Sequence, residues 1–491
     1  MLGQGCGTMD MAADPLRSDR ATAGEAHPRV VVHWPLTVLP AVMLGVLMLR
    51  PIWDFDLFWQ LRLGQMMLEH GGLLTREPFS APHLGEALPA LSWLAQIIMA
   101  AVFEAFGWTG LRLLDALAWL GGLWIVALAA RRRGACAPGL CAGLAIAFIA
   151  AHAFSSVRPQ SFALLAFGAV LALVRMDWPL RRTLVPGAIV LVLWQNLHPS
   201  VSIAAIAMAG MALPGWLAWL RDRRAPLPLA PSALAVLALL AVFATPDGAS
   251  LLTISARNAA EARGIGVAEW LPLWSPLNAQ FAPLVVVAGI AAAVLLVRGR
   301  ARLDAGEVMV AVVLGVMTLL AIRFAVFWAV ALVAPIARAV PGPVASSSRV
   351  SPAGTIGLGV IAVALAQAAL PSPFADQIPL RAITALKRAH VAGTLFTDNY
   401  GGPLIHAGAP EWRVAYDGRY WRYTSAEWDR FRAIQHGRLG LAEVERIYAP
   451  AGFLVSKALN PGLVAQLDAA ATRWRPVYAD DQVAAFVRTR R

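Results

Sequence analysis

The sequence predicts a polytopic α-helical membrane protein with a small soluble α/β domain at its C-terminal end. The first observation is composition: of 491 residues, 58% are hydrophobic and only 14% are charged, whereas a soluble globular protein has about 25% charged residues. The second is a series of apolar runs of membrane-spanning length, about 17–25 residues, that recurs as far as residue 371. The third is the mixed composition after Pro371, which is typical of a soluble domain.

The apolar runs set the predicted order of the transmembrane domain, 29–371. Before them, the residues up to about Pro28 are polar and rich in Gly and Ala, without the charged, apolar and cleavage regions of a signal peptide. We therefore expect a disordered cytoplasmic tail over 1–28. The runs themselves lie at about 31–50, 89–107, 109–130, 138–154, 160–176, 183–197, 200–220, 229–245, 280–297, 306–321, 324–340 and 354–370.

The arginine clusters between the runs predict the topology. They lie at 131–133, 175–182, 221–224 and 298–302. All four fall on the cytoplasmic side only if 89–107 does not span but lies in, or dips into, the outer interface. This gives about 11 spans, with the N-terminus inside and the C-terminal region outside. The rule also accounts for the net charge of +12, so we expect no nucleic-acid partner.

The first outer loop, 51–108, begins with two carboxylates, Asp54 and Asp56, just after the first apolar run. Residues 56–70 predict a short amphipathic surface helix with an apolar seam at helical spacing. Residue type alone favours a helix N-cap for Asp56 and a solvated loop acid for Asp54. The functional alternative is a general base, or a metal or substrate ligand, at the boundary of water and lipid. The predicted seam consists of Leu57, Leu61, Gly64 and Leu68.

Three cations lie at predicted outer helix ends. Arg158 and His198 each stand beside a proline, and Arg323 interrupts an apolar stretch. A snorkelling arginine and a capped helix end explain the first two without function. A lone charge at the position of Arg323 is costly unless it faces a cavity. The functional alternative is that these cations hold an anionic group such as a lipid phosphate.

Aromatic residues and one further acid complete the outer polar set. Trp59 lies beside the two aspartates, and Glu269 with Trp270 lies in the long loop 246–279. Aromatic side chains at an interface usually form a belt, and they also stack on sugar faces. Neither a Gly-rich phosphate loop, a nucleophile elbow nor a zinc motif is present, so no nucleotide site is expected.

The C-terminal region, 372–491, predicts an extracytoplasmic α/β domain. Asp417 and Arg419 lie in a predicted turn, where a structural ion pair is favoured over a substrate contact. Strands are expected at about 394–397, 412–417, 453–456, 475–479 and 483–488. Helices are expected near 399–407, 424–448 and 460–472.

Several short motifs are spread over nearly the whole chain after the tail. They are Asp54-Phe-Asp56 through Gly71, Pro78-Phe79-Ser80, Trp93-Leu94, Ser156-Val-Arg158-Pro159-Gln160, Asn196-Leu-His198, Thr245-Pro246, Glu269-Trp270, Arg323, Asp398-Asn-Tyr-Gly-Gly402 and Asp417-Gly418-Arg419. Together they resemble the C-type membrane glycosyltransferases, closest to uncharacterised bacterial members related to the protein mannosyltransferase and aminoarabinose transferase group.

The resemblance implies a multi-pass protein of the bacterial inner membrane that transfers a sugar from a polyprenyl-phosphate donor to an envelope glycan, lipid or protein. It implies Asp56 as the catalytic base, with Asp54 second. It places Arg158, His198 and Arg323 around the donor phosphate. Relatives often carry a second acid directly after the first, where this chain has Leu57. The resemblance leaves a divalent metal open. A lipid or polysaccharide transporter and a non-catalytic membrane assembly protein remain alternatives.

Overall fold

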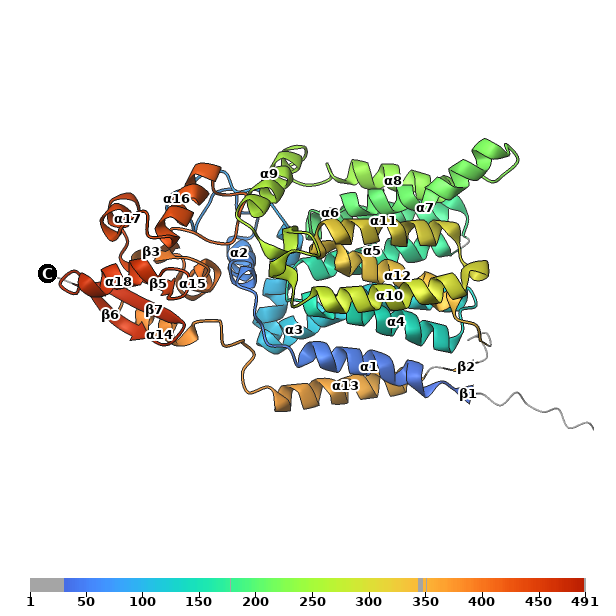
Figure 1. The fold of residues 1–491 in the computed structure, drawn as a ribbon, viewed down its shortest axis with the longest axis horizontal. Helices are drawn as coiled ribbons and strands as arrows, with labels where there is room; N and C mark the ends of the chain where they lie inside the picture. The colour runs from blue at the N-terminus through green and yellow to red at the C-terminus, as the bar shows by residue number, and fades with distance from the viewer. Residues whose placement is uncertain (1–30, 177, 343–347, 350, 490–491) are drawn as a thin grey trace, which may run out of the picture.

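A computed structural model describes residues 31–176, 178–342, 348–349 and 351–489 of the chain. The predicted tail, 1–28, lies outside the described residues. A bundle of long helices fills one half of the molecule, and a small mixed sheet covered by short helices fills the other half (Figure 1). The two halves follow the change of composition after Pro371.

The bundle has a helix for each of the 11 predicted spans. Within a bilayer no water bonds the backbone N–H and C=O groups of an apolar segment, so the segment bonds them to one another as a helix. The segment Ile322–Ala339, which contains α12, is the most enclosed of the long apolar segments described, with 78% of its residues buried. The bundle helices are α1 (Trp34–Met48), the second arm of α3 (Trp93–Arg132), α4 (Ala137–Ala151), α5 (Gln160–Arg175), α6 (Leu180–Leu197), α7 (Ser202–Arg221), α8 (Leu229–Ala241), α10 (Ala282–Arg298), α11 (Ala305–Leu320), α12 (Ala325–Ala339) and α13 (Pro352–Ala369).

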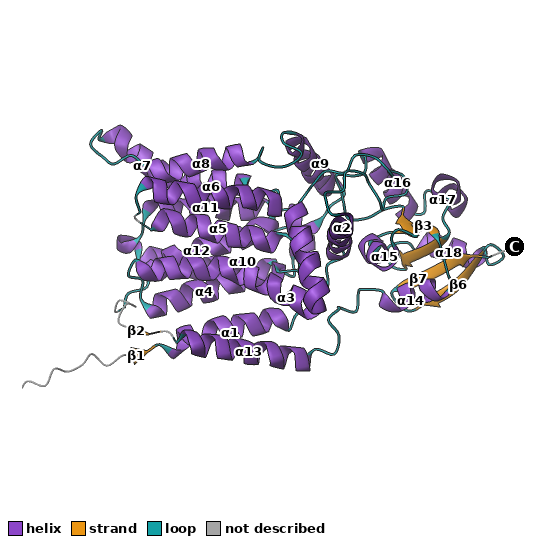
Figure 2. Cartoon of the chain, turned by 180° about the vertical axis from the view of Figure 1, so that it is seen from behind, coloured by secondary structure: helices purple, strands orange, loops and turns teal. Residues whose placement is uncertain are grey.

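Five helical segments in the described residues are long and apolar enough to cross a membrane by length and composition. Five shorter apolar helices accompany them, while α6 is in neither group. The count of about 11 spans therefore stays a prediction. Figure 2 shows the bundle helices running side by side, with α1 and α13 paired at one edge.

The α3 element is two helices joined by a sharp kink at Gly107, whose φ of 60° and ψ of −157° are not helical. Glycine adopts this conformation because it has no Cβ. The second arm, from Trp108 to Arg132, is about 37 Å long at 1.5 Å per residue, enough to cross a hydrocarbon core of about 30 Å. The first arm lies across the end of the bundle (Figure 2), which is the geometry that an interfacial segment at 89–107 requires.

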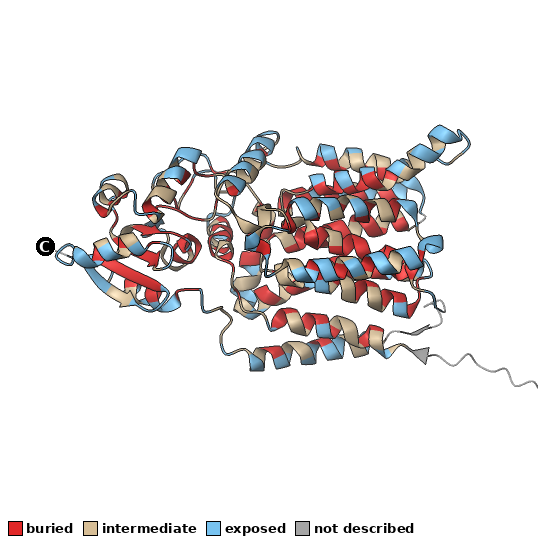
Figure 3. Ribbon diagram, viewed as in Figure 1, coloured by how far each residue is buried: buried red, intermediate tan, exposed pale blue. Residues whose placement is uncertain are grey.

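α2 (Asp56–His70) is the predicted first-loop helix, and it ends at Gly71 in the left-handed conformation. It lies between the bundle and the C-terminal sheet (Figure 1), and Figure 3 shows many of its residues as buried. The predicted seam is only partly right. Leu57, Leu61 and Gly64 are buried, whereas Leu68 is 38% exposed because it lies on the last turn, beyond the packed surface. Gly64 is required: a Cβ there would stand 2.0 Å from the carbonyl oxygen of Gln96.

The C-terminal sheet has five strands in the order β4-β3-β5-β7-β6. The pairs among β4, β3 and β5 are parallel, and those among β5, β7 and β6 are antiparallel. The prediction of a small α/β unit is therefore confirmed. The strands are β3 (Gly393–Thr397), β4 (Trp412–Val414), β5 (Gly452–Ser456), β6 (Trp474–Ala479) and β7 (Val483–Arg488).

Side chains alternate between the two faces of this sheet, as a period of two residues dictates. Leu395 and Leu454 face α14 (Leu380–Arg388), α15 (Gly401–Gly408) and α2. Phe396 and Phe453 face α16 (Ser425–Gln435), α17 (Leu441–Tyr448) and α18 (Pro461–Ala469). The predicted helix 424–448 is thus two helices, because Gly437 takes a φ of 67° between them.

The first outer loop also extends the sheet. Val414 donates its backbone N–H to the Phe79 carbonyl, and Ala81 donates to the Val414 carbonyl, both at 2.9 Å. Trp59 and Leu63 of α2 share one hydrophobic core with Leu454 of the sheet. The loop and the C-terminal unit therefore fold as one body, which holds α2 in a fixed place above the bundle.

Candidate active site

Asp54 anchors the start of α2. Its Oδ1 accepts a hydrogen bond of 2.9 Å from the backbone N–H of Asp56, and its Oδ2 pairs with Nε of Arg158. The side chain is 3% exposed. The interpretation of Asp54 as a solvated loop acid is therefore wrong: a carboxylate this close to free helix N–H groups and to an arginine is held by both.

Asp56 is the first residue of α2 and not its N-cap, which is Phe55. The carboxylate of Asp54 accepts a backbone N–H at the start of the helix, so the carboxylate of Asp56 is not needed as a cap. Trp59, one turn on, donates its indole N–H to Oδ1 of Asp56 at 3.0 Å. Burial raises the pKa of Asp56 to about 7, and the carboxylates of Glu269 and Asp417 add to the shift. A carboxyl group with this pKa takes up a proton near neutral pH, as a general base must.

Two arginines converge beside Asp56. Arg158 donates from Nη1 to Glu269 Oε2 at 3.3 Å, and Arg323 donates from Nη1 to Glu269 Oε1 at 3.4 Å. The guanidinium of Arg323 also lies 3.8 Å from the ring centroid of Trp270. Burial acts to raise the pKa of Glu269, but Arg323 and Arg158 together hold it below its usual range. Arg158 is also paired with Asp54, so the charges of the two guanidiniums are balanced by two carboxylates. The N–H groups of the arginines that these carboxylates do not occupy can still donate to an anion.

His198 lies in the turn after α6, and its Nδ1 is 2.7 Å from the hydroxyl of Ser200. Burial, together with the charges of Arg323 and Arg158, lowers the pKa of His198 to about 3. His198 is therefore neutral at pH 7. It lines the same cavity as the two arginines, where it offers a hydrogen bond and not the positive charge that the sequence interpretation gave it.

Glu269 and Trp270 reach the site on the segment 246–279, the strap, which the sequence predicts to be a long loop. The strap contains α9 (Ser250–Gly264), and the carbonyl of its last residue, Gly264, accepts a hydrogen bond of 3.3 Å from Arg432 of α16. Arg257 donates to the Tyr423 carbonyl at 2.9 Å, and Ser425 donates to Glu261 Oε1 at 2.6 Å. The strap thus ties the C-terminal unit to the arginines of the bundle.

The turn 417–420 of the C-terminal unit closes the site. Gly418 lies so close to Asp56 that a Cβ would stand 2.0 Å from Oδ1. Arg419 behind it is 1% exposed and donates to Glu77 at 2.6 and 2.9 Å and to Asp417 at 2.9 and 2.6 Å. This structure confirms the expected ion pair of Asp417 and Arg419. Glu77, the acid that completes it, was not predicted, because nothing in its local sequence marks it as buried.

Three cavities meet at Asp56, Arg158 and Tyr420, and these residues line all three. The bundle cavity, about 580 Å³, lies between the helix ends that carry Phe154 and Arg323. The central cavity, about 330 Å³, holds His198, Trp270 and Arg419. The outer cavity, about 620 Å³, lies between the start of α2 and α16. Asp56 is thus reached from more than one direction.

Every residue that the sequence analysis singled out for the site lies at this junction. The list is Asp54, Asp56, Trp59, Arg158, His198, Glu269, Trp270 and Arg323. Tyr420 and Gly418 were missed as site residues, although they belong to the turn of the Asp417 and Arg419 pair. Among the described residues, no group of three His, Cys, Asp or Glu side chains is arranged to hold a metal ion.

The fold, from the helix bundle to the C-terminal sheet, is shared with two solved structures of ArnT. It is similar to the crystal structure of ArnT from Cupriavidus metallidurans in the apo state, with a TM-score of 0.54 and 14% identity. It is equally similar to ArnT from the same organism bound to undecaprenyl phosphate, with a TM-score of 0.53 and 15% identity. Each comparison covers 92% of this chain and 97% of the other. No protein-family model matches the chain. No curated protein matches it by sequence.

Proposed function

We propose that this protein is a membrane glycosyltransferase that moves a sugar from a polyprenyl-phosphate donor to an acceptor hydroxyl, with Asp56 as general base. The observation that carries the proposal is the junction itself. A carboxyl group with a pKa of about 7 lies at the meeting point of three cavities, beside Arg158 and Arg323. The bound undecaprenyl phosphate of the similar ArnT structure supports a donor of this class.

The reaction follows from these groups. The acceptor oxygen attacks the anomeric carbon and forms the new glycosidic bond, while the bond from that carbon to the donor phosphate oxygen breaks. The acceptor proton passes to the carboxylate of Asp56. The polyprenyl phosphate leaves with the electron pair, and Arg158 and Arg323 hold its growing negative charge. His198 adds a neutral hydrogen bond, and no further reactant is consumed.

The donor lies in the bundle cavity in this proposal. Phe154, Phe281 and Val326 supply apolar surface there, next to Arg158 and Arg323. A polyprenyl phosphate has the same two parts, an apolar chain and an anionic head. The chain would extend between helix ends toward the bilayer, so the leaving phosphate and its lipid need not pass through water.

The proposal includes the orientation of the protein in the inner membrane. The site lies at the end of the bundle where α2 and the C-terminal unit sit (Figure 1). The arginine clusters at 131–133, 221–224 and 298–302 belong to connections between helices that run away from this end. The positive-inside rule puts those connections in the cytoplasm, and hence the site and the unit 372–491 on the outer face.

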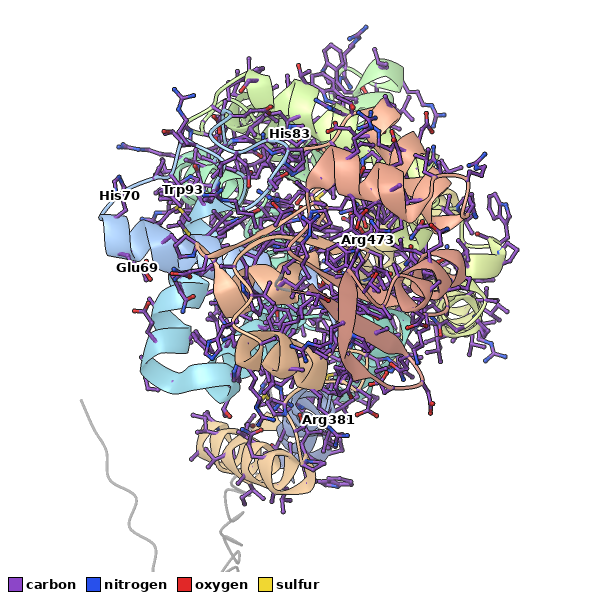
Figure 4. The ribbon with its side chains drawn as sticks, turned by 90° about the vertical axis from the view of Figure 1, so that its left-hand side faces the viewer. Glu69, His70, His83, Trp93, Arg381 and Arg473 are labelled. Carbon is purple, nitrogen blue, oxygen red and sulfur yellow. The ribbon has the colours of Figure 1, made fainter. Side chains whose placement is uncertain are left out.

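The test is mass spectrometry of envelope glycans and lipid-linked sugars in a strain that lacks the gene. Wild type should restore a sugar that the deletion removes, and Asp56→Asn at matched expression should not. The asparagine can still accept from the Trp59 indole, so the fold keeps that contact. Glu69→Gln is the control, because Glu69 is an exposed acid on the same helix (Figure 4). Full rescue by Asp56→Asn would favour transport or assembly instead.

A further inference from the structure

The outer cavity reaches Asp56 from the C-terminal side. It is enclosed by the start of α2, by the turn between β3 and α15, by α16 and by the end of the strap. Its volume of about 620 Å³ is that of a site for a small molecule or for a segment of a larger one. Around it lie Trp53, Gln377, Asn399, Tyr420, Gln435 and His436.

The outer cavity differs from the bundle cavity in what lines it. Transmembrane helix ends supply Phe154, Phe281 and Val326 to the bundle cavity. The C-terminal unit supplies both polar and aromatic side chains to the outer cavity, among them Asn399 and His436, which are exposed to water, and Trp428 and Phe431. Displacement at a carbon needs the acceptor and the leaving group on different sides of that carbon. Arg323 lines both the bundle cavity and the central cavity. With the donor phosphate at Arg323, the outer cavity is therefore the approach to Asp56 that remains for the acceptor.

The charged groups of the outer cavity are already engaged. Asp398 accepts from the Ser456 backbone N–H at 2.8 Å, and Asp417 is bound by Arg419. Arg432 donates to the Gly264 carbonyl at 3.3 Å. Asp54 is paired with Arg158. Arg158 also lines this cavity and belongs to the donor site in the proposed function. Apart from Asp56, Arg158 and His436, the groups that remain to bind a ligand are uncharged amide, hydroxyl and apolar side chains.

Those neutral groups fit hydroxyls. The side chains of Asn399 and Gln435 and the hydroxyl of Tyr420 make no hydrogen bond within the described part of the chain. Amide and phenol groups both donate and accept, which suits the hydroxyls of a sugar. Trp53 offers an aromatic face beside them. An acyl chain would leave these groups without partners, and such burial is costly.

We propose that the outer cavity is the acceptor site and that the acceptor is a neutral carbohydrate that enters from the water side. The inference rests on the proposed function and specifies its second substrate. A sugar hydroxyl held by Asn399 and Gln435 stands next to Asp56, which takes its proton as the oxygen bonds to the anomeric carbon. The phosphate leaves on the opposite side, into the bundle cavity.

The experiment fills the outer cavity and leaves the bundle cavity intact. The variants are Asn399→Trp and Gln435→Trp, which come from different elements and replace side chains without hydrogen bonds. Arg438→Trp is the control, because Arg438 is exposed just beyond α16 and does not line the cavity. Each full-length chain is purified in nanodiscs, and binding of undecaprenyl phosphate is measured by native mass spectrometry. Each is also expressed in the deletion strain for glycan analysis.

We expect both cavity variants to bind undecaprenyl phosphate within twofold of wild type and to lose at least tenfold of the glycan product. Arg438→Trp should match wild type in both measurements. If both cavity variants made as much glycan product as wild type, the acceptor site would be overturned, whereas the proposed transferase function would be unaffected. A product that is a modified lipid or protein would overturn the carbohydrate class. If wild type itself restores no sugar, the proposed function fails.

Discussion

Gly418 and Asp56 are in direct contact, although they are far apart in the chain: Asp56 begins the helix of the first outer loop, and Gly418 lies in the C-terminal unit. A Cβ at Gly418 would stand 2.0 Å from Oδ1 of Asp56. That oxygen also accepts the hydrogen bond from the Trp59 indole. The carboxylate of Asp56 is therefore fixed between its own helix and the C-terminal unit, so the unit is part of the site.

Gly418→Ala should inactivate the protein. The new methyl group must push the Asp56 carboxylate away, which breaks its bond to Trp59 and moves the base from the junction. We expect transfer to fall at least tenfold, with a stability loss of about 1–3 kcal/mol from overpacking. Gly72→Ala is the control, because a Cβ there meets nothing within 4 Å. Equal transfer by the two variants in the deletion strain would refute the contact.

The pH dependence of transfer should follow the titration of Asp56. Because burial raises its pKa to about 7, the carboxylate is protonated in acid and cannot accept the acceptor proton. The value of kcat/KM should rise about tenfold per pH unit between pH 5 and 6.5 and level off above pH 7. Initial rates on isolated membranes measure this. A flat profile from pH 5 to 8 would exclude Asp56 as the base.

Arg323→Lys should weaken donor binding. A lysine cannot both lie over the Trp270 ring and present a planar fork to Glu269 and a phosphate. We expect at least a tenfold loss in affinity for undecaprenyl phosphate, measured by native mass spectrometry in nanodiscs. Arg263→Lys is the matched control: Arg263 lies 5.8 Å from the same ring but is exposed. Similar affinities for both variants would remove Arg323 from the donor site.

Glu77→Gln should destabilise the C-terminal unit. Arg419 is fully buried, and half of its hydrogen bonds go to Glu77. Removing one partner of a buried pair costs about 3–5 kcal/mol, because the other charge stays buried. Glu69→Gln breaks an exposed pair with Arg62 and should cost less than about 1 kcal/mol. Thermal unfolding of the purified proteins tests the difference, which should appear as a lower Tm for Glu77→Gln alone.

Acid should also act through Glu77. Burial opposes its ionisation, but Arg419 and Arg422 hold the pKa of Glu77 below its ordinary value of 4.5. The ion pair therefore stabilises the fold above about pH 4.5, and this stability is lost as the pH falls through the lowered pKa. Wild type should lose Tm below pH 4.5 more steeply than Glu77→Gln. Parallel Tm curves for the two proteins would contradict this role.

The sequence was informative where local pattern decides the structure. Apolar runs located the bundle helices, because their length alone implies helix in a bilayer. Charge bias placed Asp56, Arg158 and Arg323 at one end, where the structure brings them together. All five strands of the C-terminal sheet lie within a few residues of the positions predicted for them.

The rest depends on contacts between distant segments. Glu77 looked unremarkable because its partner Arg419 lies 342 residues away. Asp54 looked like a solvated acid because the arginine that holds it comes from another helix end. The strap helix α9 was missed because its low hydrophobicity gives no clear periodicity, and it is held by bonds to α16. Where two distant segments come very close, as at Gly418 and Asp56, the sequence shows only a glycine and does not reveal its partner.

The most direct test of the account follows the donor itself. Membranes of the deletion strain, which retain its lipid-linked sugars, are mixed with purified wild type, Asp56→Asn or Glu69→Gln, and polyprenyl lipids are measured by mass spectrometry. Wild type and Glu69→Gln should consume one polyprenyl-phosphate sugar and release an equal amount of polyprenyl phosphate, while Asp56→Asn should consume none. Consumption by Asp56→Asn at the wild-type rate, or by none of the three proteins, would contradict the account.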